Sequence, residues 1–357
     1  MTNDRFILIT CQVGAERAVK DELAARWPEF RFAYSRPGFL TFKLPDAARL
    51  ADDFDLGSVF ARSYAFSLGK AKAGDSADLA RQVIGLAGGR PFERLHVWPR
   101  DRMPPGEHGY QPGFTPESDQ AEAAIRSHWP AGAAGPKKNP LARAGELVLD
   151  CVLVEPDEWW VGYHRARAWS SRRPGGMSRL ELPDDAVSRA YLKMEESLRW
   201  SRLNVEAGQR AVEIGCAPGG SCQALLERGL LVTGIDPAAM HPAVLGHPNF
   251  VHLRKRGAEV RRRELRGTRW LMADMNVAPN YTLDTVEAIV THRQMNVRGL
   301  LLTLKLLEWD LARHAPDYIE RIRGWGFPLV RARQLQHNRQ EICVAALRHR
   351  PKRKSGS

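Results

Sequence analysis

The chain has 357 residues, of which 43% are hydrophobic, so its length and composition allow about two domains with real cores. Its formal net charge of +12 favours a polyanionic partner, most simply nucleic acid. No apolar run approaches the length of a membrane span and no signal peptide is evident, so we expect a cytoplasmic protein that contacts no membrane. The five cysteines include no C-x-x-C pair, and we therefore expect neither a metal site nor a disulfide framework.

In the first half of the chain, short strand-like and helix-like segments follow one another. Apolar and β-branched runs predict strands at 5–11, 30–34, 39–44, 58–68, 95–98, 147–154 and 159–164. Amphipathic patterns predict helices at 15–27, 77–87 and 118–129. This half is predicted to be α+β, and it contains no visible catalytic constellation.

Residues 159–180 interleave aromatic and basic side chains. The set comprises Trp159, Trp160, Tyr163, Trp169, Arg165, Arg167, Arg172, Arg173 and Arg179. Aromatic faces stack on unpaired bases and arginines bind phosphates, so the pattern suits a surface for single-stranded RNA. It is equally typical of a strand with an aromatic core face and a solvated basic edge; both interpretations remain open, and the net charge of +12 slightly favours RNA.

The second half alternates strands and helices in a regular way. After a helix at 183–201, strands are predicted at 210–214, 231–235, 249–253, 269–274, 299–305, 328–335 and 341–348. Helices are predicted between them at 221–228, 282–295 and 312–324. This order predicts a mostly parallel sheet with helices on both faces, closed by an antiparallel hairpin because the last link is short. It is the layout of the Rossmann-like S-adenosylmethionine-dependent methyltransferases.

Residues 210–236 form a strand, a glycine loop, a helix and a second strand that ends in Asp236. The loop has neither the G-x-G-x-x-G fingerprint nor a Walker lysine, which favours a nucleoside cofactor without phosphates, such as S-adenosyl-L-methionine. An ordinary strand–helix–strand unit with a glycine turn is the alternative. Ser221 is expected to cap the helix that follows the loop. The predicted cofactor-binding residues are Glu213, Gly215, Cys216, Ala217, Pro218, Gly219, Gly220, Ser221, Asp236 and Asp274.

Four charged residues occupy positions where apolar residues would be expected: Lys193, Asp274, Lys305 and Glu341. Asp274 and Lys305 end parallel strands, and Glu341 opens an antiparallel one, so all three belong to the same edge of the sheet. Ligands of open α/β sheets bind outside this edge. Each residue alone is more simply a surface charge, but their convergence beside a cofactor loop predicts a catalytic site.

The motifs that contain these residues resemble the FtsJ-type ribose 2′-O-methyltransferases. They are SRAYLKMEE, EIGCAPGGSCQALLERG, VTGID, ADM, LTLK and RQEICVA, and the family carries a Lys-Asp-Lys-Glu tetrad in this order. The whole chain is similar to the bacterial 23S rRNA members with an N-terminal THUMP domain. The resemblance implies a ferredoxin-like subdomain at 1–68, a THUMP-like RNA-binding domain at 69–180, a methyltransferase domain at 181–348 and a basic disordered tail at 349–357.

The implied activity is 2′-O-methylation of a ribose, of a cytidine in 23S rRNA or its precursor, by a monomeric and metal-free enzyme. Lys305 would accept the hydroxyl proton or stabilise the oxyanion, while Lys193 and Glu341 position the ribose and its phosphate. Burial and Lys193 lower the pKa of Lys305 and Asp274 raises it, so its net protonation state is left open.

Three departures from the family pattern keep other functions open. Glu213 replaces an Asp, Ser221 stands where Trp is common, and Arg256 stands where the family has an acid. These changes motivate a non-catalytic RNA-binding or ribosome-assembly protein as the alternative. The same chemistry on tRNA is another. The two histidines of interest, His252 and His337, are expected to be structural or to face RNA.

Overall fold

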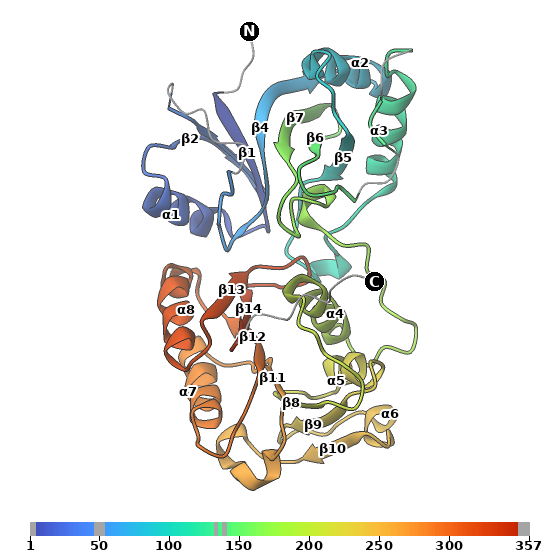
Figure 1. Cartoon of the computed structure of the whole chain (residues 1–357). Coiled ribbons are helices and arrows are strands. Elements are labelled where there is room, and N and C mark those ends of the chain that lie inside the picture. The colour runs from blue at the N-terminus through green and yellow to red at the C-terminus, as the bar shows by residue number, and fades with distance from the viewer. Residues whose placement is uncertain (1–4, 46–53, 132–134, 138–140, 349–357) are drawn as a thin grey trace, which may run out of the picture. The chain divides into compact units, whose positions relative to one another are not determined.

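The computed structural model describes residues 5–45, 54–131, 135–137 and 141–348. The chain divides into two compact units, residues 1–179 and 180–357 (Figure 1). The basic tail predicted at 349–357 lies outside the described residues. Among the described residues, no helix is both long enough and apolar enough to cross a membrane.

The first unit is built on one seven-stranded sheet with the order β2-β3-β1-β4-β7-β6-β5. Its strands are β1 (Phe6–Cys11), β2 (Arg31–Arg36), β3 (Phe39–Lys43), β4 (Ala61–Lys72), β5 (Arg94–Pro99), β6 (Leu147–Glu155) and β7 (Glu158–Arg165). Its helices are α1 (Glu16–Arg26), α2 (Ser76–Ala87) and α3 (Pro116–Ser127). The long strand β4 pairs with β1 on one side and with β7 on the other. The subdomain boundary predicted at 68/69 therefore falls inside β4, and that division stays a prediction.

The aromatic residues of the 159–180 segment pack mainly against the protein itself. Trp159 is only 4% exposed and belongs to a core with residues of α2 and α3, and Trp169 is 7% exposed. The half-buried Trp160 stacks on Tyr34, and the guanidinium of Arg173 lies 4.2 Å from the Trp169 ring centroid. The structure therefore favours the core interpretation over a surface that stacks on bases.

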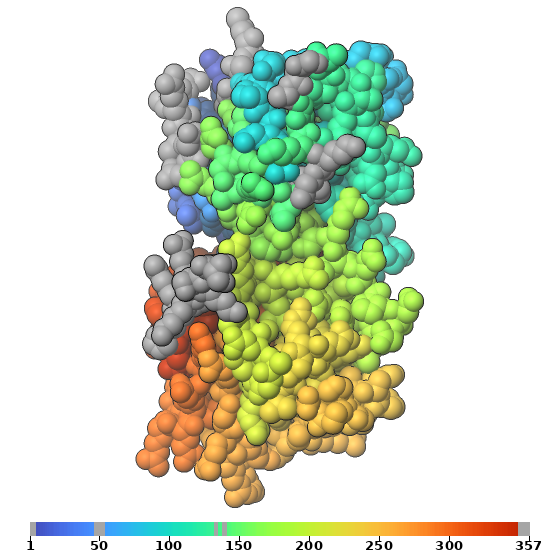
Figure 2. All heavy atoms as spheres, turned by 45° about the vertical axis from the view of Figure 1, so that its right-hand side comes forward, coloured from blue at the N-terminus to red at the C-terminus, as the bar shows by residue number. Residues whose placement is uncertain are grey.

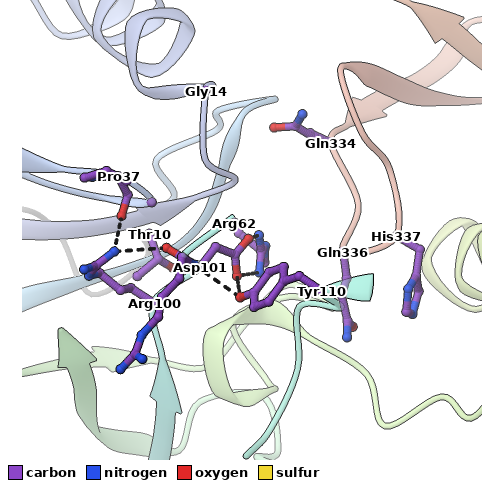
Figure 3. A network of polar contacts seen from close by, with 12 residues as sticks. Thr10, Gly14, Pro37, Arg62, Arg100, Asp101, Tyr110, Gln334, Gln336 and His337 are labelled. Atoms are coloured by element: carbon purple, nitrogen blue, oxygen red, sulfur yellow. Dashed lines mark hydrogen bonds and ion pairs between the residues drawn. The ribbon is translucent and has the colours of Figure 1, made fainter. Parts of the chain in front are cut away.

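A polar network fixes the start of β4 to the loop after β5 (Figure 3). Arg62 and Asp101 form a buried bidentate ion pair, and the Tyr110 hydroxyl lies 3.4 Å from Asp101 Oδ1. Burial and the charge of Asp101 raise the pKa of Tyr110 to about 12. Arg100 donates to the carbonyl oxygen of Pro37 at 3.0 Å. Removing one member of the buried pair would leave an uncompensated charge, which typically costs about 3–5 kcal/mol.

The second unit contains another seven-stranded sheet, with the order β10-β9-β8-β11-β12-β14-β13. Its strands are β8 (Arg210–Ile214), β9 (Leu231–Ile235), β10 (Phe250–Leu253), β11 (Trp270–Ala273), β12 (Gly299–Lys305), β13 (Leu329–Arg333) and β14 (Glu341–Leu347). The first five pair in parallel, whereas β14 pairs antiparallel with both β12 and β13. This confirms the predicted α/β fold with a terminal antiparallel hairpin.

Helices cover both faces of this sheet, with α4 and α5 on one side and α7 and α8 on the other (Figure 1). The helices of the unit are α4 (Ala190–Ser201), α5 (Gly220–Leu226), α6 (Pro242–Leu245), α7 (Pro279–Val290) and α8 (Ala315–Gly324). The prediction that the first of them begins at 183 is wrong, because α4 begins at Ala190. The preceding segment is held by a tertiary bond instead, since the backbone N–H of Val187 donates to Gln223 Oε1 at 2.9 Å.

Candidate active site

Sheet register brings the ends of three strands together at one edge of the second unit. Lys305, the last residue of β12, pairs directly with Glu341, the first residue of β14. Ala273, which ends β11, pairs with Ile214 at the end of β8, so Asp274 follows beside Gly215. The polar residues thus begin where the buried apolar strands stop, which is the usual ligand edge of an open α/β sheet.

The four predicted catalytic residues, hereafter the tetrad, form one connected cluster. The Lys193 Nζ atom lies 2.5 Å from Glu341 Oε1 and 3.5 Å from Asp274 Oδ2. Lys305 Nζ lies 3.0 Å from Asp274 Oδ1 and also contacts Glu341 Oε2. The Glu341 side chain is 2% exposed, whereas those of the other three are 18–20% exposed. Each ammonium therefore bridges the same two carboxylates at a partly open surface.

The charges of the tetrad favour the ionised forms of Lys305 and Glu341. Burial lowers the pKa of Lys305, but the charges of Asp274 and Glu341 outweigh it, and the net pKa is raised. Burial raises the pKa of Glu341, but the two lysines lower it to about 2. Lys305 is consequently an ammonium in this arrangement. The pKa-lowering effect of burial was predicted correctly and is the largest single contribution, but the contributions of the two carboxylates together outweigh it.

The glycine loop between β8 and α5 packs tightly against Asp274. Gly215 has φ +80°, and a Cβ atom there would lie 2.7 Å from the backbone oxygen of Asp274. Gly219 has φ +122°, and its Cβ would lie 2.9 Å from a methyl group of Val244. Both positions require glycine for conformation and for space.

The acid at the end of β9 closes the other side of this loop. Asp236 Oδ2 accepts from the backbone N–H of Ala217 at 3.0 Å, and Oδ1 accepts from that of Ala238 at 2.8 Å. A carboxylate retains further acceptor sites after two such bonds. The open loop and this oriented acid fit a nucleoside cofactor, with Asp236 available to a ribose hydroxyl.

The Ser221 hydroxyl does not cap α5, contrary to the prediction from the sequence. The residue that precedes the helix, Gly219, has no capping side chain, and Ser221 donates instead to Glu213 Oε1. The thiol of Cys222 donates to Glu213 Oε2 at 3.2 Å. Burial raises the pKa of Glu213 to about 7, with opposing contributions from these two hydrogen bonds.

A small cavity connects the cofactor loop with the tetrad. The centre of a water molecule can occupy about 20 Å³ of this cavity. This volume holds about one water molecule. The cavity is lined by Ala190, Lys193, Met194, Ser197, Glu213, Ser221, Met272, Ala273, Asp274, Leu301, Thr303 and Cys343. Sequence patterns did not reveal Ser197, Thr303 and Cys343 as neighbours of the site, because each sits within an ordinary helical or strand pattern.

Two further residues of the second unit, Glu196 and His252, bond to backbone groups. Glu196, which is 1% exposed, accepts from the backbone N–H groups of Gln336 and His337, both at 2.9 Å. His252 Nε2 lies 2.9 Å from the backbone oxygen of Asp236. The His252 ring thus has a backbone partner and the backbone of His337 is held by Glu196, whereas the roles expected of the two histidines stay predictions. The buried Glu196 was not identified from the sequence.

One other buried polar cluster lies in the first unit. His96, Asp150 and His164 place one potential metal-binding atom each within 4.8 Å of one another. His164 Nε2 lies 2.6 Å from the backbone oxygen of Ser171, which can only accept, so Nε2 carries a proton. The Nδ1 atom contacts Asp150, and the charge of Asp150 raises the pKa of His164 against the effect of burial. A hydrogen bond between the buried side chains of His164 and Asp150 accounts for this contact.

A basic segment follows β10 in the second unit. Residues 254–269 contain eight Lys or Arg residues and two Glu residues. Within the described part of the chain, only Lys255 of this segment forms an ion pair, with Glu264 at 2.8 Å. Arg261, Arg263 and Arg266 are exposed. Figure 2 shows this part of the surface in yellow to orange towards the bottom of the view.

In comparisons with known proteins, three relatives that match this chain share one name. Residues 186–316 match the FtsJ-like methyltransferase family. The chain is 34% identical over 181 residues to the "Ribosomal RNA large subunit methyltransferase M" of Xylella fastidiosa (strain M12), covering 48% of this chain and 50% of the relative. The protein of the same name from Halorhodospira halophila (strain DSM 244 / SL1) is 32% identical over 227 residues, or 60% of this chain and 63% of the relative.

A further relative of that name, from Xanthomonas campestris pv. campestris (strain B100), is similar over almost its whole length. It is 28% identical over 367 aligned positions, covering 96% of this chain and 99% of the relative. The chain thus spans about half the length of the Xylella relative in the stronger match, and nearly all of the Xanthomonas relative in the weaker one.

Proposed function

We propose that this chain transfers a methyl group from S-adenosyl-L-methionine to a ribose 2′-hydroxyl of 23S rRNA, because residues 186–316 match the FtsJ-like methyltransferase family. The carrying observation is the tetrad, which gathers two ammonium groups and two carboxylates beside the glycine loop. The names of the relatives support large-subunit ribosomal RNA as the substrate. The family resemblance supports a cytidine as the target, and we propose a monomer as the active form.

We assign the cofactor to the glycine loop, with Asp236 holding a ribose hydroxyl. The backbone of Asp274 packs against Gly215 of this loop. The bound cofactor supplies a methyl group on a positively charged sulfur, ready for an in-line displacement. Glu213 supports the loop from inside through Ser221 and Cys222. Arg256 is exposed, follows β10 and stands where the family pattern has an acid. This chain therefore has no acid at that position to contact the adenine.

Lys305 acts on the attacking hydroxyl as a hydrogen-bond donor. As an ammonium between two carboxylates, it cannot accept a proton, but it stabilises negative charge that develops on the 2′-oxygen. Asp274 is the more exposed carboxylate, 19% against 2% for Glu341, and is therefore the acceptor that we assign for the hydroxyl proton. With the cofactor held by the glycine loop, the oxygen–methyl bond would form as the sulfur–methyl bond broke, and Asp274 would accept the hydroxyl proton and pass it to water.

The other members of the tetrad orient these two groups. Lys193 contacts both carboxylates and fixes the distance between them. Glu341 is nearly fully buried, and burial of a carboxylate without cations is costly, so it holds both lysines in place. Such fixed positioning is what an in-line displacement requires.

The first unit and the basic segment after β10 are proposed to contact RNA. The first unit has the length and position of a THUMP-like RNA-binding region, and we retain the predicted domains 1–68 and 69–180 as a proposal. The exposed arginines of residues 254–269 carry charge that acidic neighbours do not compensate. Charge of this kind contributes sequence-independent affinity for phosphate groups.

The deciding experiment is transfer of labelled methyl groups to total RNA from a strain that lacks this gene. Label in a single 23S rRNA ribose, mapped by its resistance to alkaline cleavage, would establish reaction and substrate. The Lys305→Met protein is the matched control and should give no label. Label in tRNA would overturn the substrate, and absence of both label and calorimetric cofactor binding would support a non-catalytic RNA-binding protein.

A further inference from the structure

Arg189 lies between the cofactor loop and the tetrad. It directly precedes α4, one helical turn before Lys193. A Cβ atom on Gly220 would lie 2.7 Å from the backbone oxygen of Ser188, so the residue before Arg189 packs on the glycine loop. Ala190, the residue after it, lines the cavity beside the tetrad. The half-buried Arg189 is therefore held at the rim where cofactor and acceptor must meet.

Arg339 reaches the same rim from the turn between β13 and β14. It is exposed, and its backbone N–H donates to Glu341 Oε1 at 3.4 Å. The backbone oxygen of Arg339 accepts from Gln334 Nε2 at 2.8 Å, which closes the turn. The position of Arg339 relative to the tetrad is thus fixed by bonds on both sides of its peptide unit.

The two guanidinium groups are near enough to influence each other. Burial lowers the pKa of Arg189, the charge of Arg339 lowers it further, and Glu341 opposes both. Arg189 interacts electrostatically with both Arg339 and Glu341, and Arg339 bonds to Glu341 through its backbone, so both arginines lie on the Glu341 side of the tetrad. Two guanidinium groups at an active-site rim attract an anion, which favours its binding there.

The proposed acceptor carries such an anion next to the reacting atom. Each ribose 2′-hydroxyl in RNA is adjacent to a phosphodiester, so a ribose at the tetrad places a phosphate at this rim. Guanidinium groups bind phosphate oxygens in a directed, bidentate manner. Resting on the proposed function, we infer that Arg189 and Arg339 form a binding site for the phosphodiester that flanks the target ribose.

The test uses the full chain with Arg189→Gln, Arg339→Gln and the double variant. Arg199→Gln is the matched control, because Arg199 lies in α4, is 51% exposed and pairs with Glu195 away from the tetrad. Each rim variant should raise KM for 23S rRNA about tenfold, since one charge-assisted contact is worth roughly 1.5–3 kcal/mol. Cofactor affinity by calorimetry and KM of the control should change less than about twofold.

Salt dependence separates a phosphate contact from a structural role. Loss of one phosphate contact should reduce the slope of log(kcat/KM) against log salt by about 0.7 in the double variant. Arg189→Lys should restore much of the slope, because it keeps the charge. An unchanged slope, or a large loss of cofactor affinity in Arg189→Gln, would overturn the inference, the latter by assigning the arginine to the cofactor. Failure of the unaltered protein to methylate RNA would instead overturn the proposed function.

Discussion

Glu213 provides a test of the site that does not depend on activity. Its side chain is fully buried below the glycine loop and accepts from Ser221 and Cys222. Burial raises its pKa from 4.5 to about 7, with Asp274 and Asp236 contributing in the same direction. Between these two pH values, the folded protein keeps a proton that the unfolded chain has lost.

The sign and the size of the effect follow from proton linkage. A raised acid pKa means that the folded state binds more protons, so the free energy of unfolding falls as pH rises from about 4.5 to about 7. At 1.36 kcal/mol for each pH unit, the difference corresponds to about 3 kcal/mol. Above pH 7 this contribution is constant, and Glu213 remains as an ionised group that accepts hydrogen bonds from the neutral side chains of Ser221 and Cys222.

The assay compares the original chain with Glu213→Gln between pH 4.5 and 8.5. Amide hydrogen exchange of β8 reports on the unit that contains the residue. The difference between the two proteins cancels all other titrations and should change by about 3 kcal/mol in favour of the variant as pH rises. A difference that stays flat across this range would refute the reasoning, since it would mean that Glu213 ionises in the folded state as it does in water.

The other predictions concern the tetrad, the loop and the basic segment. Lys305→Met should reduce methyl transfer at least 100-fold, in the range of about 10²–10⁴ for a proton-transfer or oxyanion group, with cofactor affinity within twofold by calorimetry. Gly219→Ala should weaken cofactor binding and cost about 1–3 kcal/mol of stability, measured by thermal unfolding, because φ is +122° and the added methyl group meets apolar side chains. Neutralising three exposed arginines should lower the salt slope of RNA binding by about 2 at unchanged saturated turnover, and equal slopes would contradict an RNA contact there. The three arginines to be neutralised are Arg261, Arg263 and Arg266.

The sheet of the second unit could be predicted because each strand is an apolar run of few residues. The polar residue that ends or opens such a run is visible in the sequence, as with Lys305 after GLLLTL and Glu341 before ICVAAL. Parallel topology then places those residues at one edge without knowledge of any distance. The clustering of Asp274, Lys305 and Glu341 was therefore accessible from pattern and topology together, whereas Lys193, which lies in a helix, was added through the family resemblance.

Features that depend on tertiary hydrogen bonds were not accessible in this way. Pro183 and the two acids after it are a good helix start locally, yet the Gln223 side chain holds the backbone of Val187 and delays α4 to Ala190. Ser221 is a good capping residue, yet it donates to the buried Glu213. In the first unit, alternating aromatic and basic residues did not reveal which side chains face the core, and Trp159 and Trp169 are buried.

The protonation state of Lys305 decides how the reaction should respond to pH. With its pKa raised by Asp274 and Glu341 despite burial, the lysine stays an ammonium throughout the neutral range. If it acts by stabilising the 2′-oxyanion, log kcat should be flat from pH 7 to 9, measured under single-turnover conditions so that product release is not observed. If it acts as the base, log kcat should rise with unit slope over the same range, because the neutral amine becomes tenfold more abundant with each pH unit. A unit slope would contradict Asp274 as the proton acceptor, because it would assign the hydroxyl proton to the neutral amine of Lys305.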